Sequence, residues 1–149
     1  MTVILRNLRD RIAQLEGFSP PRLARTCPTG WPAVDATLPG GGLLQGALHE
    51  VHSPDPADGA ATGFACHLMS RFLAAMPDAA LWASCRCDLF APGLKAAGVD
   101  PSRLLAVRCQ TSSDILYVTE ESCKSIYIKF LSADLGDIDF SLSRRLQLT

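Results

Sequence analysis

The sequence predicts an α/β fold in which helices pack on a mostly parallel β-sheet. Segments typical of strands and segments typical of helices alternate four times with short links, and such an alternation builds right-handed crossovers onto a parallel sheet. Of the 149 residues, 48% are apolar and only 19% are charged, which is enough apolar surface for one folded domain. No internal repeat or low-complexity tract interrupts the pattern.

The first 26 residues predict a separate amphipathic helix and a linker. Apolar side chains recur there at spacings of three, four and three, with arginines on the other faces. The stripe consists of Leu5, Leu8, Ile12 and Leu15. Gly17 and Pro20–Pro21 end the helix. We therefore expect two parts: residues 1–26 as helix and linker, and residues 27–149 as the α/β core. The stripe packs either on its own core or on a neighbouring molecule.

A glycine-rich segment opens the core. Pro28–Gly30 leads into a short segment that Pro39–Gly42 ends. Residues 47–52, Ala-Leu-His-Glu-Val-His, predict the first strand. A loop rich in proline, aspartate and glycine follows over residues 53–62.

The remaining segments supply the alternating elements. The predicted strands cover residues 79–84, 104–108 and 125–131. Helices are predicted before, between and after them: over 63–75, over 92–97 closed by Gly98, and from a cap at Ser112 or Ser113 to about Cys123. A last helix runs from Ser141 through Arg144 and Arg145.

The loop between the first predicted strand and its helix lies where a phosphate-binding loop would be expected. A working loop reads GxxxxGK[ST], with lysine on the β- and γ-phosphates and a hydroxyl on magnesium. With Gly63 as the second glycine, Asp58 replaces the first, and the lysine and hydroxyl positions hold Phe64 and Ala65. Gly59 is nearby, but no lysine precedes Lys95. We expect this degenerate loop to bind no cofactor.

Composition narrows the remaining classes of function. The formal net charge is −1, which gives no bulk positive field for nucleic acid. The six cysteines include no second paired cluster to complement Cys85 and Cys87, so we expect reduced thiols in a cytoplasmic protein and no metal site. No apolar run approaches the length of a membrane span.

Four stretches resemble a known family. These are Pro28–Val51 (PTGWPAVDATLPGGGLLQGALHEV), Gly59–Phe64, Asp88–Leu105 (DLFAPGLKAAGVDPSRLL) and Ser141–Leu148. They are similar to the ImuA family, the RecA-like accessory proteins of bacterial damage-induced mutagenesis. The first and third stretches are the most specific. The resemblance implies a RecA-like core that is incomplete at its C-terminus.

The resemblance also implies a role in the SOS response. ImuA proteins are thought to act with ImuB, a catalytically inactive relative of Y-family polymerases, and with an error-prone polymerase during translesion synthesis. The N-terminal stripe would then bind a partner or mediate self-association. Arg144 and Arg145 are candidates for contact with DNA or with a partner.

Residue by residue, the likeness to RecA cores predicts the loss of catalysis. Alignment on Gly98-Val99-Asp100 puts Arg86 where a glutamate would activate water. The aspartate that supports magnesium has one counterpart, Asp134, three residues beyond the predicted strand. We therefore expect no enzyme activity. Two alternatives remain open: inhibition of cell division, as in the SulA family, and a weak or vestigial ATPase.

Overall fold

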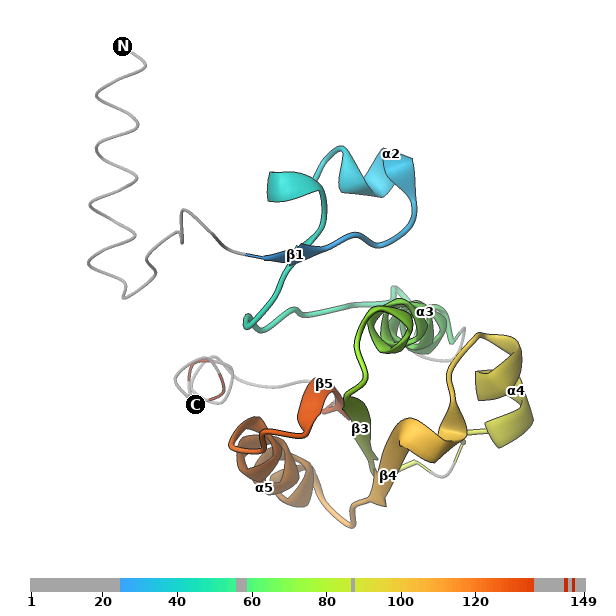
Figure 1. The fold of residues 1–149 in the computed structure, drawn as a ribbon. Helices are drawn as coiled ribbons and strands as arrows, with labels where there is room; N and C mark the ends of the chain where they lie inside the picture. Colours follow the sequence, from blue (N-terminus) through green and yellow to red (C-terminus); the bar gives the residue numbers. More distant parts are fainter. Residues whose placement is uncertain (1–24, 56–58, 87, 136–143, 145, 147–149) are drawn as a thin grey trace. The chain divides into compact units, whose positions relative to one another are not determined.

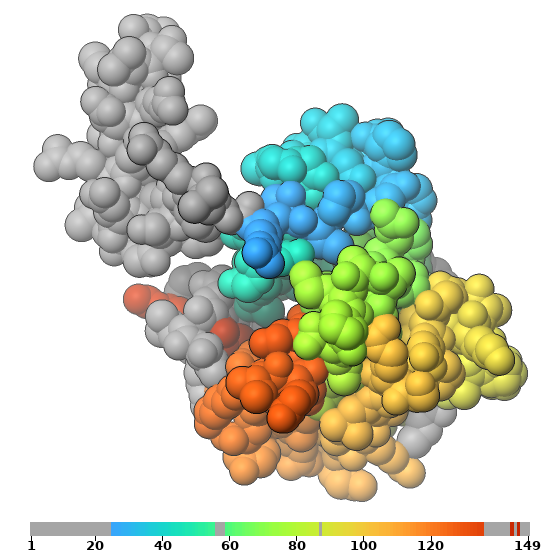
Figure 2. All heavy atoms as spheres, viewed as in Figure 1, coloured from blue at the N-terminus to red at the C-terminus, as the bar shows by residue number. Residues whose placement is uncertain are grey.

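The computed structural model describes residues 25–55, 59–86, 88–135, 144 and 146 (coloured in Figure 1 and Figure 2). The chain divides into two compact units, Met1–Gly46 and Ala47–Thr149. The predicted stripe of Leu5, Leu8, Ile12 and Leu15 lies outside the described residues. The boundary predicted after residue 26 stays a prediction.

Residues 25–46 form a small unit of short elements. Strands β1 (Thr26–Cys27) and β2 (Leu43–Leu44) pair antiparallel, and between them lie helix α2 (Pro32–Asp35) and the 3₁₀ turn η1 (Pro39–Gly41). The β1–β2 ladder requires a glycine at Gly42, because a Cβ there would lie 2.5 Å from the carbonyl oxygen of Cys27.

The carboxylate of Asp35 organises the turn before α2. Its Oδ1 accepts hydrogen bonds from the N–H and the hydroxyl of Thr29, both at 2.8 Å, and its Oδ2 accepts one from the N–H of Gly30 at 3.2 Å. Thr29 is fully buried. Hydrogen bonds between residues no more than six positions apart therefore hold this turn in place.

The second unit contains a three-stranded parallel sheet with helices on both faces, which confirms the predicted α/β class (Figure 1). Strand β3 (Ala79–Ser84) is central, between β4 (Leu104–Arg108) and β5 (Ile128–Asp134). Helices α3 (Ala60–Ala75) and α4 (Ala91–Ala96) supply core residues for one face, and α5 (Ser112–Cys123) supplies them for the other.

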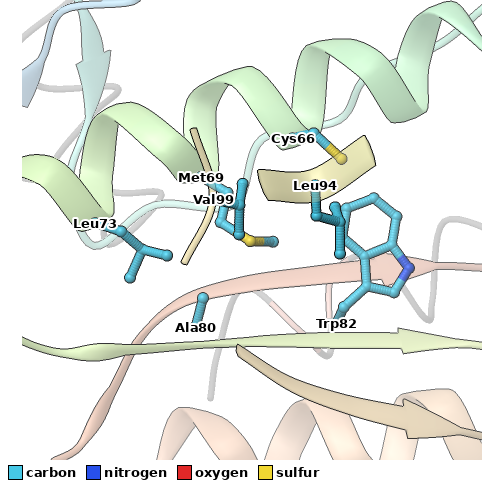
Figure 3. Packing of buried hydrophobic residues seen from close by; sticks show 7 residues of the cluster. All are labelled: Cys66, Met69, Leu73, Ala80, Trp82, Leu94 and Val99. Atoms are coloured by element: carbon cyan, nitrogen blue, oxygen red, sulfur yellow. The ribbon is translucent and has the colours of Figure 1, made fainter. Parts of the chain in front are cut away.

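The larger core cluster lies between α3, α4 and β3. In Figure 3, side chains from α3 extend toward those of Ala80 and Trp82 on β3. The cluster consists of Cys66, Met69, Leu73, Ala80, Trp82, Leu94 and Val99. The rings of Phe72 and Phe130, 5.7 Å apart, bring β5 into the same packing. Burial of these side chains from water is the main force that holds α3 on the sheet.

An arginine closes the end of the sheet where the strands begin. Arg103, in the 3₁₀ turn η2 (Pro101–Arg103), donates to the carbonyl of Leu73 at 2.7 Å and, through Nε, to that of Asp78 at 3.1 Å. It also donates to the carbonyl of Met76. These carbonyls belong to the last turn of α3 and its link to β3, where a helix leaves acceptors without partners.

Two predicted strands were wrong in position. Residues 47–52 form no strand, although their polar–apolar pattern favours one, because no strand among the described residues pairs with them. The strand predicted over 125–131 runs instead from Ile128 to Asp134, where it pairs with the whole of β3.

Two helix starts also differ from the prediction. Helix α3 begins at Ala60 rather than residue 63, since Gly59 already terminates the preceding loop. Helix α5 is capped by Thr111, not by Ser112 or Ser113. The Thr111 hydroxyl accepts from the N–H of Asp114 while the Asp114 carboxylate accepts from the N–H of Thr111, which is a capping box.

Candidate functional site at the carboxyl end of the sheet

An ion pair joins the carboxyl ends of β3 and β5. Asp134 is the last residue of β5, and its Oδ2 lies 2.7 Å from Nε of Arg86, two residues after the end of β3. Arg86 Nε also lies 3.3 Å from Oδ2 of Asp88. Sequence reasoning singled out Arg86 and Asp134 separately. The structure brings them together.

Ser84 holds both partners of this ion pair in place. Its buried hydroxyl donates to Asp134 Oδ2 at 3.2 Å and accepts the Arg86 N–H at 2.9 Å. Ser84 and Asp134 are register partners on adjacent strands, so the strand pairing itself sets their separation. Sequence reasoning missed Ser84. A polar residue at the end of an otherwise apolar strand was the available signal.

The geometry favours an ion pair over a magnesium site. A bound Mg²⁺ takes carboxylate oxygens as ligands. Here the Asp134 carboxylate oxygen that accepts from Ser84 also carries the guanidinium contact. The positive charge of Arg86 at this oxygen opposes the binding of a cation, and Arg86 stands where a glutamate was expected. The residues present therefore do not fit the Mg-ATP chemistry of a RecA core.

The ion pair adds little to stability. The side chains of Arg86 and Asp134 are 47% and 32% exposed, and exposed pairs contribute at most about 1 kcal/mol. Its consequence is electrostatic: the guanidinium of Arg86 places a positive charge against the carboxylate at the end of β5.

The start of α3, which follows the degenerate phosphate loop, lies at the same end of the sheet, because α3 runs antiparallel to the strand that follows it. Gly59 adopts a left-handed conformation, with φ of 69°, as the N-cap of α3. The N–H of Gly63 donates to the carbonyl of Gly59 at 2.8 Å, inside the first helical turn. In a phosphate loop, backbone N–H groups face the ligand. Here the N–H of Gly63 is instead used in a hydrogen bond within the helix.

The other predicted residues of the loop take structural positions. Phe64 and Ala65 are half-buried, and Ala65 packs against the larger core cluster. Asp58 lies outside the described residues. The helix N-terminus therefore offers apolar packing where a phosphate site needs a lysine and a hydroxyl.

Of the two C-terminal arginines, Arg144 is helical and exposed. Arg145 lies outside the described residues. Among the residues that the structure describes, no group of three or more histidine, cysteine or acidic side chains is arranged to hold a metal ion. No described helix is long and apolar enough to cross a membrane.

Comparison with known proteins supports the family resemblance. No protein-family model matches the chain. Two curated proteins do match, each named Protein ImuA, from the Caulobacter vibrioides strains NA1000/CB15N and ATCC 19089/CB 15. Each is 33% identical over 122 residues, which is 80% of this chain and 50% of the relative. The chain thus spans about half the length of these relatives, and on this similarity it belongs to the ImuA family.

Proposed function

We propose that this chain is a non-catalytic adaptor of DNA-damage-induced mutagenesis that binds an ImuB-type polymerase relative. Membership of the ImuA family supports the mutagenesis role. Because the chain spans half of its curated relatives, both the partner and the pathway are part of the proposal.

The Arg86–Asp134 ion pair carries the non-catalytic part of the proposal. Hydrolysis of ATP by a RecA-like core needs a lysine, a hydroxyl and a glutamate together, and loss of any one would be severe. This chain holds Phe64, Ala65 and Arg86 at those positions. The guanidinium after β3 also places a positive charge against the carboxylate that would support magnesium.

Isothermal titration of the 149-residue chain with Mg-ATP tests this part. We expect no binding at micromolar nucleotide and no phosphate release. The matched variant is Arg86→Gln, which removes the positive charge but keeps a hydrogen-bonding side chain. It should also fail to bind, because the lysine and the hydroxyl are still missing. Micromolar binding by the unaltered chain would establish the vestigial ATPase instead.

Co-purification with the ImuB-type protein of the same organism tests the adaptor role. A complex at micromolar concentrations that survives gel filtration is the expected result. Absence of a complex between two folded proteins would overturn the proposal. Filamentation of cells that overproduce the chain, with no ImuB-type complex, would support the SulA-like alternative.

The predicted N-terminal stripe gives this interaction a matched pair of variants. Leu8→Glu with Ile12→Glu places two charges on the apolar stripe, whereas Asn7→Glu with Gln14→Glu places the same charges on the opposite face of the predicted helix. We expect only the first pair to weaken the complex, by at least tenfold. Equal effects from both pairs would remove the stripe from the interface. Light scattering of the same variants tests self-association.

A further inference from the structure

Two cysteines lie next to each other where β3 and β4 end. The parallel ladder pairs Ser84 with Arg108, the last residues of β3 and β4, and the residue that follows each strand is a cysteine, Cys85 and Cys109. The Cys109 N–H donates to the Ser84 carbonyl at 3.0 Å, so the ladder continues to this point. Both cysteines are free thiols.

The alternation of side chains along a strand puts both cysteines on the same face of the sheet. Leu81 and Ala83 of β3 face α5, and Cys109 packs with them against Ile115 of α5. Because side chains two residues apart share a face, Cys85 continues the row of Leu81 and Ala83. Neighbouring strands lie about 4.8 Å apart, and disulfides join Cα atoms about 4.4–6.8 Å apart.

The two thiols differ in their access to a reagent. Cys85 is exposed, whereas Cys109 is 5% exposed. Burial raises the pKa of the Cys109 thiol, and the nearby Cys85 and Asp114 raise it further. The effect of Cys85 on the pKa of the Cys109 thiol agrees with the short distance between the two strand ends. An exposed thiol beside a buried one is the arrangement of an attacking and a resolving cysteine.

We propose that Cys85 and Cys109 form a reversible dithiol–disulfide site that reacts with low-molecular-weight disulfides such as oxidised glutathione. The Cys85 thiolate attacks one sulfur of oxidised glutathione, which forms a mixed disulfide and releases one glutathione. The Cys109 thiolate then attacks the Cys85 sulfur and releases the second glutathione. Two electrons and two protons pass from the protein thiols to the two glutathione molecules formed.

The position of this site links it to the ion pair described above. Arg86 directly follows Cys85 and contacts Asp134 on the other side of β3. Oxidation of Cys85 would therefore take place next to the residue that forms the Arg86–Asp134 contact.

Thiol trapping followed by trypsin digestion and mass spectrometry tests the proposal in the unaltered chain. Cleavage after Arg71, Arg86, Arg108 and Lys124 leaves Cys85 in the peptide 72–86 and Cys109 in the peptide 109–124. In mixtures of reduced and oxidised glutathione, we expect these two peptides to become cross-linked as the mixture becomes oxidising, and to separate again when it becomes reducing.

Matched variants identify which two cysteines form the cross-link. Peptide 109–124 also holds Cys123, an exposed cysteine at the end of α5, so Cys123→Ser must keep the cross-link. Cys85→Ser must abolish it and leave Cys109 reduced. Three results would overturn the proposal: thiols that all stay reduced, a stable mixed disulfide on Cys85 with Cys109 still free, or a cross-link through any other cysteine.

Discussion

The two units of the chain are held together by different forces. In residues 25–46 the organising contacts are hydrogen bonds to one carboxylate, Asp35, from residues that are five and six positions away. In the second unit the organising contacts are apolar side chains from helices and strands that lie far apart in the sequence. All the buried apolar side chains among the described residues belong to this second unit.

This difference has a consequence for stability. A unit fixed by local polar contacts opens locally, at a cost below that of global unfolding, whereas a shared apolar core is lost in one cooperative transition. Substitutions in the first unit should therefore change local exchange, and substitutions in the second should change global stability. Four predictions test this contrast, from the largest effect to the smallest.

The largest effect is expected for a leucine of the central strand. Leu81 on β3 and Leu105 on β4 are register partners, but Leu81 is 2% exposed and Leu105 is 53% exposed. Leu81→Ala should cost about 2–5 kcal/mol of unfolding free energy, because it leaves a cavity in the core. Leu105→Ala should cost under about 1 kcal/mol. Urea unfolding measures both, and equal losses would contradict the assignment of β4 to the sheet edge.

The next effect is expected at Arg103, which joins η2 to the end of α3. Arg103→Ala removes hydrogen bonds to the carbonyls of Leu73, Met76 and Asp78 and should cost about 1–3 kcal/mol. Arg103→Lys should recover only a part, since one ammonium cannot reproduce the planar guanidinium. Arg108→Ala, at the exposed end of β4, is the control and should change stability by less than about 0.5 kcal/mol. Thermal unfolding followed by circular dichroism would rank the three.

A local effect is expected at Asp35. Asp35→Ala removes the acceptor for the N–H groups of Thr29 and Gly30, so opening of this turn should become easier by about 1–3 kcal/mol. Hydrogen exchange should accelerate at those two amides and remain unchanged at Leu81 and Ala83. Asp35→Asn, which keeps one carbonyl acceptor, should be intermediate. Faster exchange in β3 would show that the two units unfold together.

The smallest effect is a pH dependence at the capping box of α5. Hydrogen bonds from Thr111, through its side chain and its backbone, lower the pKa of the Asp114 carboxyl below its ordinary value. Since the folded-state pKa is the lower one, the contribution of Asp114 is present above the unfolded pKa and is lost as pH falls through the folded one.

Comparison with Asp114→Asn measures this contribution. The parent chain should be more stable than the variant at neutral pH, and the difference should disappear under acid conditions in urea titrations at a series of pH values. A difference that stays constant with pH would mean that the Asp114 charge has no part in the capping box.

The sheet unit was the part of the fold most readily predicted from the sequence. Strands over 79–84 and 104–108 matched the structure because each is a short apolar run bounded by turn residues. The strand at 47–52 failed, although its pattern is as good, because pairing needs a partner strand that a pattern cannot supply. The position of β5 was shifted for the same reason: its register is set by β3, residue against residue.

The candidate site also has features that the sequence predicted and features that it did not. Residue identity alone established the absent lysine and hydroxyl at Phe64 and Ala65, and also the arginine at position 86. The hydrogen bond of Gly63 to Gly59 depends on where α3 begins, and the sequence misplaced that start by three residues. Neither the Arg86–Asp134 pair nor the bridging role of Ser84 could be read from the sequence, since 48 residues separate the two charges.

The sequence by itself determined the class of fold, the family resemblance and the residue types at the positions compared with a phosphate-binding loop. Those properties depend on residue type, on spacing and on local turns. Only the tertiary structure decided that Asp134 meets Arg86 and that Cys85 adjoins Cys109. Each of these contacts forms because parallel strands bring distant residues to one edge of a sheet, and the order and register of those strands depend on the packing of the whole core.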